Sequence, residues 1–231
     1  MDFLSEVLDW FANNWDGSAG YVARLAEHLN VSAVSVVIAA GLAIPPAAWI
    51  GHRGKGAVLG ASLANLGRAI PSFGIVALSL PVTIWLAKRL PFIDSGLGFF
   101  PTAVAMVALA IPPIFLGVLT GVREVDQDTV EAGRGMGLSE VQLLTRVELP
   151  LASPLILSGL RVAFVQVVAT ATLGALVAYG GLGRFIVDGF AQHDDVELFA
   201  GAVLVAALAL LSDWLFRLLA RRLPTSRVVS P

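Results

Sequence analysis

The residues that most often carry chemistry in proteins are few in this chain and lie far apart. The chain has no cysteine and three histidines, His28, His52 and His193. The lack of cysteine excludes a disulfide framework, a thiolate metal site and a cysteine nucleophile. Because the histidines are widely separated along the chain, a histidine-based metal cluster is not expected. We predict no metal site and no catalytic residue.

One short segment is similar to a phosphate-binding loop, but its spacing is wrong. It contains a Gly-Lys pair at Gly54 and Lys55. In a phosphate-binding loop a glycine stands five residues before that pair's glycine, and a Ser or Thr follows the lysine. Here those positions hold Trp49 and Gly56. We therefore predict that this chain binds no nucleotide and no other cofactor.

Two charged residues, Arg68 and Asp213, interrupt otherwise apolar runs. An arginine at the centre of a membrane helix costs about 2.5–3.5 kcal/mol on insertion scales, so such residues usually have a partner or a function. Arg68 is predicted either to pair structurally or to line a translocation path. Carriers driven by ion gradients usually keep carboxylates or histidines within their spans. Asp213, close to the end of its run, does not form such a relay alone.

The overall composition is that of a membrane protein. Of the 231 residues, 57% are hydrophobic and 14% are charged, and the mean hydropathy is +0.82. A typical soluble domain is about 25% charged. The net charge of −2 and the absence of a dense basic run give no indication of nucleic-acid binding.

Five runs are apolar and long enough to cross a bilayer. A hydrocarbon layer of ~30 Å requires a helix of about 20 residues, and a helix satisfies its own backbone hydrogen bonds in lipid. We predict an all-α polytopic membrane protein with spans at 31–51, 57–87, 95–122, 162–183 and 198–216.

The distribution of Lys and Arg predicts the orientation of these spans. Cytoplasmic segments are enriched in positive charge. If the N-terminus lies outside, nine Lys and Arg residues fall in the inner segments and four in the outer segments. We therefore predict an N-out, C-in topology.

The chain ends are predicted to lie outside the membrane domain. Segment 1–29 contains Phe3, Leu4, Val7, Leu8 and Phe11 at helical spacing. Such an amphipathic extracytoplasmic helix lies on the outer leaflet or docks a partner, and the residues leave both alternatives open. The membrane domain then covers 30–220, and a cytoplasmic tail covers 221–231.

The inner loop at 123–154 is the longest polar segment and is predicted to form two short helices. Asp128 followed by Glu131 favours one helix start, and Ser139 followed by Gln142 is typical of a capping box. Gly137 separates the two helices, and Pro150 is expected to end the second. A rigid pair of helices between two spans is suited to transmit motion between a soluble partner and the membrane.

This loop resembles the cytoplasmic signature of the permease subunits of binding-protein-dependent ATP-binding-cassette importers. That signature is Glu-Ala-Ala, three residues, Gly, nine residues, Ile, one residue, Leu-Pro. Every spacing matches, with glycine replacing the second alanine and valine replacing isoleucine. The matching positions are Glu131, Ala132, Gly133, Gly137, Val147, Leu149 and Pro150.

The resemblance covers roughly residues 30–220 and implies a type I, MetI-like permease fold in a bacterial inner membrane. It implies that the first loop helix docks on a dimer of ATPase subunits, which hold the ATP and Mg²⁺. Other implied partners are an extracytoplasmic binding protein and a second permease subunit, either the same chain or a paralogue. The resemblance gives this chain itself no enzymatic activity.

Segments 69–73, 169–175 and 180–183 are most similar to the branch that transports glycine betaine, carnitine and choline. This branch implies a small osmoprotectant as the substrate, proline betaine included. Permeases for methionine and other amino acids share parts of these segments, so an amino-acid importer is the alternative. A stand-alone secondary carrier is an alternative of a different class, and the missing coupling residues argue against it.

Overall fold

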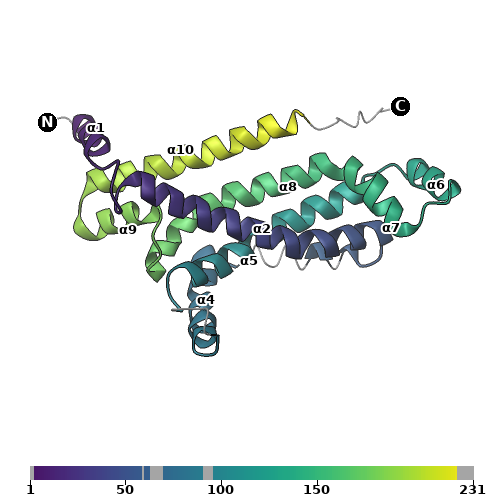
Figure 1. Cartoon of the computed structure of the whole chain (residues 1–231), viewed down its shortest axis with the longest axis horizontal. Helices are drawn as coiled ribbons and strands as arrows, with labels where there is room; N and C mark the ends of the chain where they lie inside the picture. Colours follow the sequence, from purple (N-terminus) through teal and green to yellow (C-terminus); the bar gives the residue numbers. More distant parts are fainter. Residues whose placement is uncertain (1–2, 59, 63–69, 91–95, 223–231) are drawn as a thin grey trace.

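The computed structural model describes residues 3–58, 60–62, 70–90 and 96–222, and Figure 1 shows their arrangement. All regular elements of these ranges are helices. In chain order they are α1 (Phe3–Asn13), α2 (Tyr21–Arg53), α4 (Ser72–Ala87), α5 (Phe99–Arg123), α6 (Gln127–Gly135), α7 (Glu140–Leu143), a π-helical turn (Leu144–Glu148), α8 (Leu149–Thr170), a 3₁₀ helix (Ala171–Val177), α9 (Gly183–Gln192) and α10 (Asp195–Ala220).

Four helical stretches in the described ranges are long and apolar enough to cross a membrane. They are α2, α5, the continuous stretch Glu140–Val177 and α10, and α4 is a shorter apolar helix of 16 residues. The all-α polytopic fold is therefore confirmed. α2, α5 and α10 contain or closely match the expected spans at 31–51, 95–122 and 198–216, because each run is apolar over its whole length.

The predicted second span, 57–87, is not one helix. The chain bends at Ile70, and Pro71 has an extended backbone before α4 begins. A proline fixes its own φ and disfavours the helical conformation of the residue before it. The run is therefore interrupted here, although it is long enough to form one helix. Figure 1 shows α4 directed away from the bundle of long helices.

The predicted fourth span, 162–183, begins and ends too late in the chain. The helical stretch that overlaps it starts at Glu140 and ends, as a 3₁₀ helix, at Val177. Pro150 was expected to end the second loop helix, but it lies in the first turn of α8. The π-helical turn before it shifts the hydrogen-bond pattern, so the missing N–H of proline does not stop the helix.

α5 lies at the centre of the bundle and packs against α2 and α8. Its buried side chains include Met106, Ile114 and Val118. α5 and α8 meet at two glycines: a Cβ on Gly117 would lie 2.8 Å from the Cα of Gly159. Small residues at a crossing allow membrane helices to approach closely, so this pair sets the α5–α8 distance.

An ion-pair network joins α8 to α10. Arg161 Nε lies 3.1 Å from Asp213 Oδ1, and Arg217 Nε lies 2.7 Å from Asp213 Oδ2. Asp213 therefore has two partners and links two long helices.

The bundle has two distinct ends. α1 and α9 lie at one end, and α6 and α7 lie at the other, toward which α10 runs (Figure 1). α1 packs on the chain's own helices, because the Phe3 ring lies 5.3 Å from Phe199 and the Trp10 ring lies 5.1 Å from Phe185. Its residues Leu4 and Leu8 remain exposed.

Candidate functional site

The loop helix α6 begins two residues earlier than its sequence pattern suggested. Asp126, and not Asp128, is the N-cap: its carboxylate accepts hydrogen bonds from the Thr129 backbone N–H at 3.0 Å and from the Thr129 hydroxyl at 2.9 Å. A capping carboxylate satisfies amide groups that have no partner within the helix. The helix itself is present where it was expected.

The break between α6 and α7 is built as predicted. Gly137 has φ +85°, in the left-handed region that only glycine adopts readily. Ser139 and Gln142 form a complete capping box, in which the Ser139 N–H donates to Gln142 Oε1 at 2.9 Å and the Gln142 N–H donates to Ser139 Oγ at 3.4 Å. Local sequence therefore determines this turn.

A small apolar cluster holds α6 onto α7 and the π-helical turn. Its buried members are Val125, Val130 and Leu143, and Leu138 and Val147 pack against them. A Cβ on Gly133 would lie 2.5 Å from Leu143 Cδ2. Glycine in place of the family's second alanine therefore makes room for Leu143.

The seven positions of the loop signature divide into two groups. Glu131, Ala132, Gly137 and Pro150 are exposed. Gly133 is buried, and Val147 and Leu149 are half-buried against the apolar clusters. Of the second group, Gly133 and Val147 pack within the loop, and Leu149 packs against the main core of the bundle.

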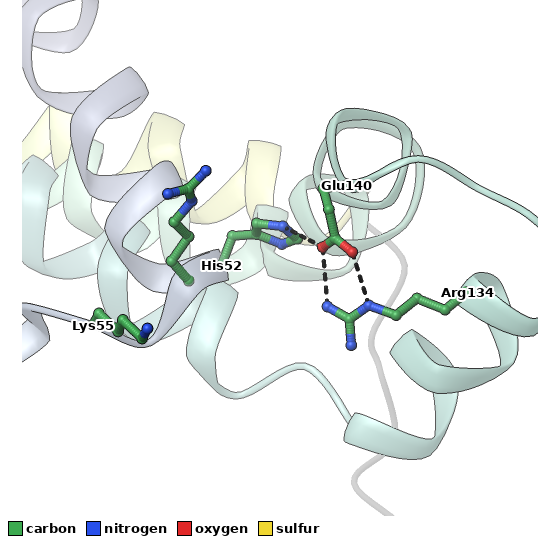
Figure 2. Close-up of a pocket in the computed structure, with 5 residues that line it drawn as sticks. His52, Lys55, Arg134 and Glu140 are labelled. Atoms are coloured by element: carbon green, nitrogen blue, oxygen red, sulfur yellow. Dashed lines mark hydrogen bonds and ion pairs between the residues drawn. The ribbon is translucent and has the colours of Figure 1, made fainter.

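A polar cluster that was not predicted joins this loop to the end of α2. The His52 ring places Nδ1 2.8 Å from Glu148 Oε2 and Nε2 2.8 Å from Glu140 Oε2. Arg134 donates to both oxygens of Glu140, with 3.0 Å for each hydrogen bond. Figure 2 shows the Glu140 carboxylate between the His52 ring and the Arg134 guanidinium. Four side chains from α2, α6, α7 and the π-helical turn thus meet at one point.

The centre of this cluster is buried and its edge is open. The side chains of His52 and Glu148 are 3% and 5% exposed, whereas those of Glu140 and Arg134 are about half exposed. The Glu140 carboxylate raises the pKa of the Arg134 guanidinium above its ordinary value. Two pockets, of about 360 and 300 Å³, flank the cluster, and basic side chains line them: Arg53, Lys55, Arg123 and Arg134.

At the opposite end of the bundle, a glycine-rich turn is held by α2. The Gly181 N–H donates to Glu27 Oε2 at 2.7 Å, and the Tyr179 hydroxyl donates to the Glu27 backbone carbonyl at 2.7 Å. Burial and the Glu27 carboxylate raise the pKa of Tyr179 to about 12, so its hydroxyl keeps the proton that it donates.

At each glycine of this turn, a larger residue would be strained or would meet a neighbouring atom. Gly181 has φ +78°, and a Cβ on Gly180 would collide with the Glu27 carboxylate. A Cβ on Gly183 would collide with the Thr172 carbonyl. Leu182 between them is completely buried. The segment at 180–183 is therefore a tight turn after a membrane helix, as its glycine content suggested.

Arg68, the predicted path or pairing residue, lies outside the described residues. Within the described ranges, no three histidine or acidic side chains are grouped as a metal site would require. His52, Glu148 and Glu27 were missed as site residues. One signal was available: Glu148 is a carboxylate between the apolar signature residues Val147 and Leu149, and a buried carboxylate requires a partner.

Comparison with known proteins agrees with the loop signature. Residues 33–224 match the family of the binding-protein-dependent transport system inner membrane component. The osmoprotectant import permease protein OsmW of Salmonella typhimurium is 33% identical, over 93% of this chain and 94% of its own. The carnitine transport permease protein OpuCD of Listeria monocytogenes is 31% identical over 92% and 89% of the two chains. The choline transport system permease protein OpuBB of Bacillus subtilis is 29% identical over 85% of each.

Solved structures of other transporters share the fold. A chain of the MetNI methionine ABC transporter in an inward-facing conformation superposes with a TM-score of 0.73 at 21% identity, covering 88% of this chain and 96% of its own. A chain of an amino acid ABC transporter with histidines gives a TM-score of 0.66 at 19% identity. These matches confirm the MetI-like permease fold. The chain therefore belongs to the inner-membrane components of binding-protein-dependent transport systems, the multi-pass, non-enzymatic permease subunits that work with a separate ATPase and a binding protein.

Proposed function

We propose that this chain forms the membrane path for a small osmoprotectant such as glycine betaine, carnitine, choline or proline betaine. The observation that supports this substrate class is the set of relatives whose names include choline, carnitine and osmoprotectant transport, each aligned over at least 85% of both chains. The resemblance read from the sequence includes the turn at 180–183, where Gly181 has a positive φ and a Cβ on Gly183 would collide with the Thr172 backbone.

The second candidate substrate class is methionine or another amino acid. It is favoured by the superposition on a methionine transporter chain, but at 21% identity that likeness concerns the fold alone. The relatives that are about 30% identical therefore weigh more in the choice of substrate.

Uptake by the reconstituted complex tests the substrate class. The chain, its ATPase and its binding protein are placed in proteoliposomes with ATP inside, and radiolabelled choline, glycine betaine, carnitine and methionine are offered separately. We expect ATP-dependent uptake of at least one quaternary ammonium compound and none of methionine. Uptake of methionine alone would replace the proposed substrate with the second candidate.

We further propose that α6 docks on an ATPase dimer and transmits its movement to the long helices. The exposed group Glu131, Ala132, Gly137 and Pro150 forms the contact, and the buried group Gly133, Val147 and Leu149 fixes the loop. A second permease subunit, either a copy of this chain or a paralogue, completes the membrane path. Purification of the intact complex followed by mass measurement distinguishes a homodimer from a heterodimer.

The proposed orientation places α6 and α7 in the cytoplasm and α9 outside. It rests on the nine-to-four distribution of Lys and Arg. Because the chain has no cysteine, single cysteines at positions 134 and 184 report on the two sides. An impermeant thiol reagent added to intact cells should label position 184 and leave position 134 unlabelled, and the reverse pattern would invert the topology.

Arg68 is proposed to line the path or to pair with another membrane group. In either case Arg68→Leu should lower uptake while the complex still assembles, because a charge in a span is retained for a partner or a path. Uptake at the parental level, normalised to the amount of protein in the membrane, would contradict this proposal. It would show that the Arg68 side chain extends to the membrane surface without a role in transport.

A further inference from the structure

The His52 ring faces a carboxylate from each of its two nitrogens. Each contact is 2.8 Å long, and the ring is 3% exposed. An ionised carboxylate only accepts hydrogen bonds, and a neutral imidazole has only one N–H to donate. Two carboxylates on one ring therefore match the doubly protonated imidazolium, which donates from both nitrogens.

The charges of the four side chains joined in this cluster balance in this state. Glu140 and Glu148 contribute two negative charges, and Arg134 and the His52 imidazolium contribute two positive charges. The other cationic side chains around the ring, from the pocket walls, are Arg53, Lys55 and Arg123. Arg53 lies over the Trp49 ring at 4.4 Å, and Figure 2 shows Lys55 apart from the dashed contacts. The buried Glu148 carboxylate therefore has His52 as its charged partner.

The two carboxylates belong to two ends of one segment. Glu140 opens α7, and Glu148 closes the π-helical turn that leads into α8. His52 lies in the last turn of α2, 96 residues before Glu148. Arg134 extends the same cluster to α6, the loop helix with the exposed signature residues. A displacement of α6 or α7 therefore reaches α2 through one ring.

We propose that His52 is a positioning residue for energy coupling: its imidazolium fixes the inner end of α2 to α7 and to the π-helical turn, so that movement of the loop moves α2. This inference rests on the proposed docking of the loop on an ATPase. The cluster acts through hydrogen bonds and ion pairs.

The protonation state is tested first. The complete transporter is prepared with nitrogen-15-labelled histidine, and the spectrum of the His52→Gln complex is subtracted to isolate the His52 signals. We expect both ring nitrogens to carry a proton in the assembled transporter. A spectrum of a neutral ring, with one protonated and one bare nitrogen, would overturn the imidazolium and the proposal with it, whatever the variants below show.

The coupling role is tested with a pair of substitutions that spares the fold. His52→Gln alone leaves the buried Glu148 without its charged partner, which destabilises a protein, whereas replacing both members of a buried ion pair with apolar side chains is often tolerated. His52→Leu combined with Glu148→Leu should therefore assemble with the ATPase at the parental level. We expect about a tenfold drop in substrate imported per ATP hydrolysed, a typical size for coupling between two sites.

Two controls separate the possible failures. Lys55→Gln removes a positive charge from the same pocket without touching the cluster, and it should leave the import ratio unchanged. Gly137→Asp tests the loop itself. If Gly137→Asp stops import but the double leucine variant imports at the parental ratio, the His52 proposal is wrong and the docking loop stands. If Gly137→Asp imports normally, the proposed docking loop is wrong.

Discussion

The two ends of α2 are tied to the same continuous helical stretch, Glu140–Val177 and the turn that follows it, but by different kinds of contact. At the end that the proposed orientation places outside, called the outer end, the Gly181 N–H donates to the Glu27 side chain, and the His28 ring donates to the Val168 carbonyl at 2.8 Å. At the other end, called the inner end, His52 contacts two carboxylate side chains.

The outer contacts join side chains to backbone groups, whereas the inner contacts join side chains to one another. At the outer end, the Gly181 N–H can reach the Glu27 carboxylate because the glycines of the turn leave room for that side chain. The inner contacts depend on the identity of four side chains from separate elements. Because these elements include the loop with the family signature, the inner end is suited to respond to a partner and the outer end to hold its shape.

The largest expected effect is at the inner end. Gly137→Asp should abolish uptake and release the ATPase in detergent, because it adds a charge to the proposed docking surface at a residue with φ +85°. A non-glycine residue in this region costs about 1 kcal/mol or more. The measurements are uptake, ATPase co-purification and binding-protein-stimulated hydrolysis.

A matched pair of alanine variants tests how much the backbone conformation at Gly137 contributes to ATPase binding. Gly135 and Gly137 are both exposed, and no atom lies within 4 Å of a Cβ added at either one. Only Gly137 has a positive φ. Gly137→Ala should therefore weaken ATPase retention while Gly135→Ala behaves like the parent. Equal behaviour of the two alanine variants would show that backbone conformation is not what the loop requires.

A smaller effect is expected at the outer end. Glu27→Ala removes the acceptor of the Gly181 N–H, a charged hydrogen bond that is worth about 1.5–3 kcal/mol when buried. The Glu27 side chain is 41% exposed, which weakens this hydrogen bond. We therefore expect the free energy that holds the turn in place to fall by about 1 kcal/mol and uptake to fall roughly fivefold. ATPase co-purification should be unchanged, because the turn lies at the other end of the bundle (Figure 1).

The control for this variant is Glu27→Gln, which keeps an oxygen for the Gly181 N–H and removes the charge that faces Arg24 at 2.9 Å. It should retain most of the uptake. Loss of the ATPase from either Glu27 variant would contradict the division between the two ends of α2.

The link between α8 and α10 provides a reference that involves neither end of α2. Asp213→Asn should lower the free energy of unfolding of the purified complex by about 0.5–1 kcal/mol, the upper range for partly exposed ion pairs. The side chains of Arg161 and Asp213 are 34% and 27% exposed. In a double-mutant cycle with Arg161→Gln, a coupling energy near zero would show that this pair does not stabilise the bundle.

The smallest effect is expected for Glu131→Ala. Glu131 is exposed on α6, and Asp126 rather than the expected Asp128 caps that helix. Alanine is the best helix former, so the folding change should stay below about 0.5 kcal/mol. We expect less than a twofold change in stimulated ATP hydrolysis. A complete loss would instead show that the Glu131 carboxylate makes the dominant contact with the ATPase.

The sequence by itself determined the features that depend on near neighbours. Long apolar runs must be helical in lipid, so the all-α class and the helices α2, α5 and α10 were predicted. The Ser139–Gln142 capping box and the Gly137 turn were also predicted, because their hydrogen bonds and backbone angles involve residues within one turn. The family followed from the loop signature, which is itself a local pattern.

Only the tertiary structure decided which distant residues meet. Glu148 and His52 are 96 residues apart, and Gly181 and Glu27 are 154 apart. Their contacts depend on which faces of α2 and the Glu140–Val177 stretch point toward each other, and the packing of the whole bundle around α5 sets those faces. The passage of the helix through Pro150 likewise required a π-helical turn. Hydrophobic length and local propensity contain no information about which faces meet, because contacts between separate helices fix them.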